Sequence, residues 1–377
     1  MIPAESVSSL VLLSNLPKAL LDSNKFLTQG FVHADAEFMT SGLLHDHKLL
    51  TSLGQNLVGL TLTAYSDGPA QLNIDLDCLS SMSNLQHLHI HSGGRDSVWQ
   101  THGLLSSLTA LESFTFLHEG KLHGPLLSAL GMLPKLTAVT TSSFPWGNLE
   151  LCSTQFRALK MLKIASCEID DVAQNISFSV CQPFDALCDL RLVDCRVTSA
   201  PVPLKSLPNL TRVSFTRCDF DVHSWLSEAL GGAAQNQILK LKCVLIKMIP
   251  RSICWMSGLK QLNLQFSSLQ DLPAELVHLT NLEVLDVSEN DFTSVPEVLE
   301  QMTHLQDLDI MCCDFIQLTR PLTFFSTFAN LRSLSLSAPR QWWNSSSMFH
   351  LGEMQAALDK AFMHRSPTDK PYLYHQR

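Results

Sequence analysis

The sequence is poor in charge and contains no long apolar run. Charged residues make up 16% of its 377 residues, whereas roughly 25% is typical of globular proteins. Hydrophobic residues make up 45%, so the chain can form a core and lacks the composition of a disordered protein. No apolar run approaches the roughly 18 residues that a transmembrane helix requires. The sequence therefore predicts a folded chain with no membrane span.

Basic residues are also in deficit. The 26 Lys and Arg residues are outnumbered by 35 Asp and Glu residues, which gives a net charge of −9. Proteins that bind nucleic acids usually show a basic excess or stripe, so we expect no nucleic-acid partner. The N-terminus carries Glu5 and no Lys or Arg before Lys18, whereas a secretory signal peptide begins with a basic region. We therefore expect a cytoplasmic protein.

The short motifs of common enzyme and cofactor sites are missing. The sequence has no G-x-x-x-x-G-K-[ST], no G-x-G-x-x-G, no G-x-S-x-G and no H-E-x-x-H, so it offers no phosphate loop, nucleophile elbow or zinc-protease helix. No C-x-x-C pair occurs among the eleven cysteines. We expect no catalytic residues, no cofactor and no bound metal.

What the sequence does contain is an internal repeat. The apolar frame L-x-x-L-x-L begins at Leu57, Leu85, Leu111, Leu136, Leu159, Leu187, Leu210, Ile238, Leu259, Leu282, Leu305 and Leu331. These starts lie about 25 residues apart, within the 20–29 residues of leucine-rich repeats. The frame also fits Val7–Asn15, and one degenerate repeat near Leu27–Phe38 fills the remaining gap. The pattern predicts about fourteen repeats.

The repeat resembles the leucine-rich-repeat superfamily. The stretch Leu259–Phe292 contains L-P-x-x-L-x-x-L-T-N-L-x-x-L-D-V-S-x-N and is similar to the Ras-group intracellular repeats, whereas the cysteine-bearing repeats of 159–218 resemble the ribonuclease-inhibitor-like type. The resemblance implies an α/β solenoid, a horseshoe with a concave parallel sheet and a convex side of short helices, 3₁₀ turns and loops. Residues 1–338 would form it, with 1–56 irregular, and 339–377 would form a C-terminal cap helix and a frayed tail.

The resemblance also implies a column of structural side chains. Eight residues after each frame start, the family places Asn or Cys to bond neighbouring loops. Here that column contains Asn15, Cys167, Cys195, Cys218, Asn290 and Cys313. Buried backbone groups at such a corner need partners, so we expect buried, reduced thiols in a reducing compartment. Ser267 departs from the column and predicts a looser turn.

Alternation along a strand places the frame leucines inward and the intervening residues outward. His87, His89 and His91 then share one face, and His118 lies in the next repeat. The four could hold a metal, but same-face residues roughly 6.5–7 Å apart suit two ligands better than three. Solvated or partner-contacting histidines are the alternative that we prefer, with His89 at the centre.

Charge on the outward positions is segregated by sign. The bases are Lys160, Lys163, Arg191, Arg212, Arg217, Lys240, Lys242 and Lys260, and the acids that follow are Glu283, Asp286, Glu289, Asp307 and Asp309. Simple solvation of an exposed sheet is one explanation. The other is a docking surface that orients a protein partner, with Lys163, Arg191, Lys242, Asp286 and Asp309 at its centre.

The sequence thus predicts a monomeric, non-catalytic scaffold or adaptor that binds a protein on its concave face. The substrate-recognition arm of a ubiquitin ligase is an alternative, although no F-box is evident, and a receptor or sensor ectodomain is another. The resemblance also implies an association with the cytoskeleton or cilium. After the last frame, Trp342 and Trp343 precede Met348–Arg365, whose spacing predicts an amphipathic helix. That helix would cap the exposed end of the core, and residues beyond Pro367 would fray.

Overall fold

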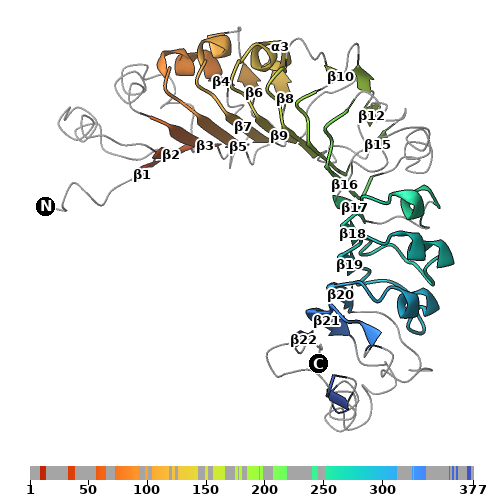
Figure 1. Ribbon diagram of the computed structural model, residues 1–377. Helices are drawn as coiled ribbons and strands as arrows, with labels where there is room; N and C mark the ends of the chain where they lie inside the picture. Colours follow the sequence, from red (N-terminus) through yellow and green to blue (C-terminus); the bar gives the residue numbers. More distant parts are fainter. Residues whose placement is uncertain are drawn as a thin grey trace, which may run out of the picture. The chain divides into compact units, whose positions relative to one another are not determined.

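The computed structural model contains two compact units, 1–202 and 203–377. It describes residues 9–13, 33–38, 57–64, 73–92, 98–100, 104–118, 121–123, 126–142, 149–151, 156–165, 175–176, 178–180, 185–194, 196–197, 207–218, 240–244, 249, 251–311, 325, 327–336, 356, 359–360, 362–363 and 372–374. Within each unit, the repeats stack so that successive strands lie side by side (Figure 1).

The first unit is built on a sheet with one strand per repeat. In spatial order the strands are β1 (Ser9–Leu13), β2 (His33–Phe38), β3 (Gly59–Ala64), β5 (His87–Ser92), β7 (Ser113–His118), β9 (Ala138–Ser142), β11 (Met161–Ala165) and β14 (Asp189–Val193). The pairs from β1 to β14 are parallel. β2 pairs with both β1 and β3, which confirms the degenerate repeat predicted there.

The second unit continues the same design. Its strands are β16 (Arg212–Thr216), β17 (Lys240–Val244), β18 (Gln261–Asn263), β19 (Val284–Asp286), β20 (Asp307–Ile310), β21 (Ser333–Leu336) and β22 (Tyr372–Tyr374). All neighbouring pairs are parallel. β22 lies where a frayed tail was expected. That expectation fails for these three residues because the edge of β21 offers unpaired backbone groups, which a following strand can satisfy.

The frame leucines form the core, as the repeat predicts. Leu88, Phe114, Leu190, Leu262 and Leu285 are all buried, because the alternation of the strand turns every second side chain away from solvent. The predicted parallel sheet of a leucine-rich-repeat solenoid is therefore confirmed in each unit.

The chain returns to the next strand through short 3₁₀ turns. These are η1 (Leu76–Ser81), η2 (Leu104–Ser107), η5 (Arg251–Trp255), η6 (Ala274–His278) and η7 (Glu297–Gln301), with one short helix α3 (Leu126–Gly131). Several of the described returns close with two i→i−3 bonds, such as Leu279 N–H to Leu276 O and Leu282 N–H to Leu279 O, both 3.0 Å. The apolar side chains of this return complete the core.

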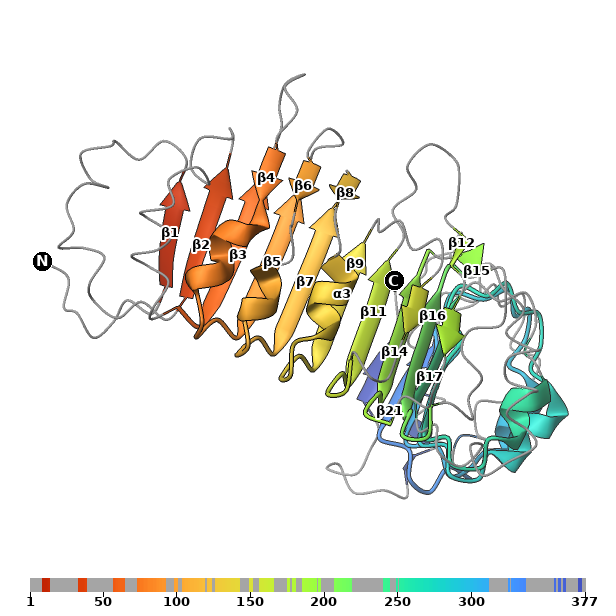
Figure 2. The same cartoon turned by 90° about the horizontal axis from the view of Figure 1, so that it is seen from above.

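The first unit carries more structure on its return side than the repeat predicts. A parallel sheet of β4 (Asn73–Asp75), β6 (Val98–Gln100) and β8 (Lys121–His123) lies across the core from β3, β5 and β7 (Figures 1 and 2). Two further pairs join β10 (Leu149–Leu151) to β13 (Phe178–Val180) and β12 (Asn175–Ile176) to β15 (Arg196–Val197). The longer repeats of this unit have enough chain to pair twice.

Candidate functional site

The solvent-facing side of each sheet is organised in columns. In the first unit, register pairs Lys163 with Arg191. In the second unit, register aligns Lys242, Asn263, Asp286 and Asp309 in one column, which continues to Ser335. We call these the central columns. All five charged residues predicted to lie at the centre of the docking surface occupy a central column of one unit or the other.

The histidine strand of the first unit faces a neutral, polar neighbourhood. Register places His89 between Thr61 and Thr115, and the ring Nδ1 of His87 lies 2.8 Å from the Ser113 hydroxyl. His118 pairs with Ser92 rather than with His91, so its position alternates to the other side of the strand. The grouping of all four histidines is therefore wrong. Among the described residues, no group of three potential ligands could hold a metal ion.

Arg191 is engaged within its own strand. Its guanidinium donates from Nε to Asp189 Oδ1 (3.0 Å) and from Nη2 to Asp189 Oδ2 (2.8 Å). The Asp189 side chain is only 3% exposed and Arg191 is 49% exposed, so the pair partly neutralises a buried carboxylate. This hydrogen bond raises the pKa of the Arg191 guanidinium, against the opposing effect of burial. Arg191 thus also has a structural task within the first unit, because it pairs with the buried Asp189 carboxylate.

The acidic side of the second unit is a hydrogen-bonded network. Asp286 accepts from Asn263 Nδ2 at Oδ2 (2.7 Å), and from the hydroxyl (2.7 Å) and amide (3.2 Å) of Ser288 at Oδ1. Gln265 Nε2 donates to the Ser288 hydroxyl at 3.0 Å. Together these bonds fix the Asp286 carboxylate, so β19 presents its two oxygens in defined places.

Asp309 extends this network to β20. Burial raises the pKa of its carboxyl, and the nearby charges of Asp286 and Glu289 act in the same direction. Hydrogen bonds from the Met311 amide and from Ser335 oppose that rise in the pKa; the amide bond to Oδ1 is 3.0 Å. The carboxylates of Asp286 and Glu289 therefore lie close enough to disfavour the charged form of Asp309.

Bases occupy the other end of the same sheet. Arg212, Lys240 and Lys242 lie on β16 and β17, and all three are exposed. Lys260 and Glu283 form the junction between the two signs through an ion pair of 3.7 Å. The second unit, taken by itself, therefore shows the predicted segregation of charge by sign.

The column of structural side chains is best developed at Asn290. This residue is 2% exposed. Its Oδ1 accepts from the amides of Ser267 and Leu269, each at 3.0 Å, and its Nδ2 donates to the carbonyls of Leu264 (2.9 Å), Val287 (2.7 Å) and Ser288 (3.1 Å). One amide side chain thus ties together the loops of two repeats.

Cys218 and Ser267 occupy the same column as Asn290, and each makes one hydrogen bond of a kind that Asn290 also makes. Cys218 Sγ donates to Thr216 O (3.5 Å) and Ser267 Oγ donates to Gln265 O (3.2 Å), in each case to the carbonyl two residues before. Cys218 is half-buried, so the expectation that this thiol is buried is wrong, whereas Ser267 is buried. A hydroxyl replaces a thiol here because both are small donors. Asn15, Cys167, Cys195 and Cys313 lie outside the described residues.

The position before that column has a left-handed backbone. Asp194 (φ 53°), Arg217 (φ 51°), Phe266 (φ 53°) and Glu289 (φ 55°) share it in four repeats. Phe266 is the unusual member, because its ring is 50% exposed and large side chains disfavour this backbone region. Its amide donates to Ser288 O (3.3 Å), as the Glu289 amide donates to Met311 O (2.9 Å), so Phe266 and Glu289 are neighbours in successive repeats. No glycine marked this position in the sequence, and we did not predict it.

Comparison with known families agrees with this architecture. Residues 257–315 match the family model described as "Leucine rich repeat". This segment of the chain therefore consists of leucine-rich repeats. The matched segment covers the network of β18–β20 and Asn290, where the repeat is most regular. The match does not separate the Ras-group resemblance from the ribonuclease-inhibitor-like one.

Solved structures of other leucine-rich-repeat proteins are similar only distantly. A leucine-rich-repeat protein of Leptospira interrogans is 18% identical over 92% of this chain and 91% of its own, with a TM-score of 0.49. The Drosophila Toll–Spätzle complex is 15% identical over 87% of this chain and 57% of its own, with a TM-score of 0.40. A plant peptide hormone receptor bound to RGF2 is 15% identical over 91% of this chain and 58% of its own, with a TM-score of 0.42. No curated protein matches the sequence.

Two further expectations concern the rest of the chain. Among the described residues, no helix is long and apolar enough to cross a membrane. In the predicted cap helix, residues 356, 359 and 360 are helical, Phe362 is buried and Met363 is exposed. Trp342 and Trp343 lie outside the described residues.

Proposed function

We propose that this leucine-rich-repeat protein is a non-catalytic scaffold that binds a protein partner on the solvent-facing side of the sheet in its second unit. The segregation of charge within that unit carries the proposal: exposed bases lie on β16 and β17, and acids lie on β19 and β20. A partner with the opposite arrangement would be oriented as it approaches, because complementary potentials steer encounter and fix register.

The hydrogen bonding of the acidic side supports recognition over simple solvation. Solvation requires only polar side chains, but Asp286 is held by Asn263 and Ser288. A fixed carboxylate loses little conformational freedom when a partner binds, which is how preorganisation improves affinity. For the first unit, taken by itself, we propose separate contacts at Lys163, at the half-exposed Arg191 and at His89, which register places between two threonines.

Charge reversal on β17 tests the proposal. The variant Lys240→Glu with Lys242→Glu should lose a captured partner, because both side chains are exposed and belong to the basic end. Arg251→Glu reverses a charge on the return side, at η5, and is the matched control that should keep the partner. Arg191 is left unchanged in this test, since its removal would strand the buried Asp189 carboxylate.

Salt provides an independent measurement. Capture by the wild-type protein should weaken as ionic strength rises, because the Debye length falls to roughly 8 Å at 0.15 M salt. A partner that binds the β17 variant as tightly as wild type, or that ignores salt, would contradict the proposal. A ubiquitin-ligase arm and a receptor ectodomain are special forms of such a binding protein, and the identity of the captured partner distinguishes them.

A further inference from the structure

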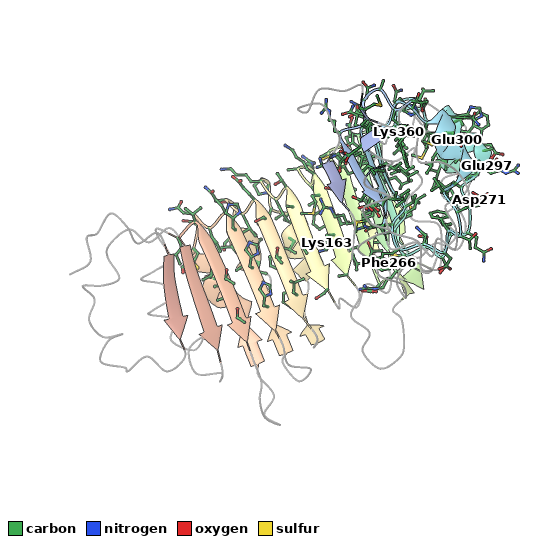
Figure 3. The ribbon with its side chains drawn as sticks, turned by 90° about the horizontal axis from the view of Figure 1, so that it is seen from below. Lys163, Phe266, Asp271, Glu297, Glu300 and Lys360 are labelled. Carbon is green, nitrogen blue, oxygen red and sulfur yellow. The ribbon has the colours of Figure 1, made fainter. Side chains whose placement is uncertain are left out.

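Phe266 is an exposed aromatic residue at an unfavourable place. Its ring is half exposed, and its backbone lies in the left-handed region. That conformation costs a large side chain free energy that glycine avoids and asparagine reduces. Folding alone gives no reason for a large apolar side chain here. The residue is labelled in Figure 3, on the loop that follows β18.

The surroundings of Phe266 indicate what could cover it. Glu289 is its neighbour in the next repeat, as the parallel amide bonds of the two residues show, and its side chain is exposed. Asp286 and Asp309 lie on the strands β19 and β20 just before this edge. An apolar residue of the partner would pack on the ring, but the Glu289 carboxylate would then face an apolar group. A lysine would suit the carboxylates and use little of the ring.

Arginine satisfies both requirements. Its guanidinium is planar, stacks on aromatic faces and binds carboxylates in a bidentate manner. We propose that the partner of the second unit presents an arginine that stacks on Phe266 and pairs with Glu289. This arginine belongs to a basic segment of the partner that lies along Asp286 and Asp309. This inference rests on the proposed function and names the chemistry of the partner at one end of the docking surface.

The raised pKa of Asp309 agrees with that chemistry. Its charge is disfavoured by burial and by Asp286 and Glu289, so like charges gather at this end of the sheet. A cationic segment would relieve the repulsion on binding, which is the complementarity expected of a docking surface.

Two peptides of equal charge separate stacking from simple attraction. Fluorescein-labelled hexa-arginine and hexa-lysine are titrated into the full-length protein, and binding is followed by fluorescence anisotropy. Wild type should bind hexa-arginine roughly two- to fivefold more tightly than hexa-lysine, the ratio that an exposed cation–π contact provides. Phe266→Asn should reduce the ratio to about one, whereas Phe266→Tyr, which keeps the ring, should retain it.

The controls keep the result interpretable. Asparagine tolerates the left-handed region, so Phe266→Asn should melt no lower than wild type, which excludes unfolding as the cause. Trp255→Ala removes another exposed aromatic residue, on η5, and should leave the preference for arginine unchanged. Glu289→Gln should weaken the binding of both peptides, because it removes a carboxylate that attracts either cation.

Several outcomes would overturn the inference. Equal binding of the two peptides by wild type would do so, as would failure of both to bind, or a preference that survives in Phe266→Asn. A preference lost in Trp255→Ala would assign stacking to the return side instead. If the β17 charge reversals abolish partner capture while the peptides show no preference, the docking surface stands and only its arginine chemistry fails.

Discussion

Asn290 offers the sharpest test of how one repeat is held to the next. Replacing it with alanine deprives the buried amides of Ser267 and Leu269 of their acceptor. A buried polar group left without a partner costs about 1–3 kcal/mol, so the two amides alone predict a loss of about 2–6 kcal/mol. The carbonyls that lose the Nδ2 donor, among them that of Leu264, add to the same effect.

The matched control is an asparagine in the same repeat that makes a single exposed bond. Asn281 Nδ2 donates to Ser257 O at 2.8 Å near solvent, where water can replace it. Asn281→Ala should therefore cost no more than about 1 kcal/mol, the range of one ordinary hydrogen bond. The comparison isolates burial and connectivity, since both variants delete the same side chain.

Urea unfolding of the two variants measures the difference in stability. Because repeat arrays can unfold in pieces, hydrogen exchange followed by mass spectrometry should be recorded over residues 261–292. Exchange in Asn290→Ala should accelerate in that segment. An Asn290→Ala protein as stable as Asn281→Ala, with unchanged exchange, would refute the reasoning.

Three further predictions follow from buried or half-buried side chains. Thr141 is buried, and its hydroxyl has no hydrogen-bond partner among the described residues. Thr141→Val should therefore raise the free energy of unfolding by roughly 1–2 kcal/mol, and a melting temperature that falls instead would contradict this prediction. Burial, with the charge of Asp286, raises the pKa of Asp309 in the folded protein. Above about pH 3.9, the ordinary pKa of an aspartate in the unfolded chain, the charged carboxylate of Asp309 therefore destabilises the fold. Asp309→Asn should therefore be more stable than wild type at pH 7 and gain nothing at pH 3, as urea melts at both pH values can check. Burial raises the pKa of Cys243 to about 12, so a maleimide should label the half-buried thiol of Cys218 well before that of Cys243. Peptide mass spectrometry gives the order of labelling, and a reversed order would contradict the packing of β17.

The sequence predicts the sheet well because one rule, burial of alternate side chains, acts in every repeat. Leu262 and Leu285 occupy frame positions and are buried, and no long-range information is needed to place them. Asn290 is also found by counting from the frame. The sequence does not show that Ser267 serves in this column, because the hydrogen bond to the carbonyl two residues back needs only a small donor and not specifically Asn or Cys.

Features that depend on contacts between particular side chains escaped the pattern. Asp189 and Arg191 are two residues apart and face the same side, so their pairing could have been anticipated, but the burial of Asp189 could not. The left-handed backbone of Phe266 was invisible because left-handed positions are usually recognised by glycine. The pairing of β22 with β21 joins segments that the repeat frame does not relate.

The uneven length of the repeats has a consequence for how this protein can change. Equivalent residues lie 23 positions apart between Asn263 and Asp286, 26 between His87 and Ser113, and 28 between Lys160 and Cys188. Register on the sheet stays unbroken in each case, because the extra chain is taken up on the return side. Insertions and deletions there leave the columns of the sheet aligned, so the return side can acquire new loops or lose them while the binding surface keeps its spacing.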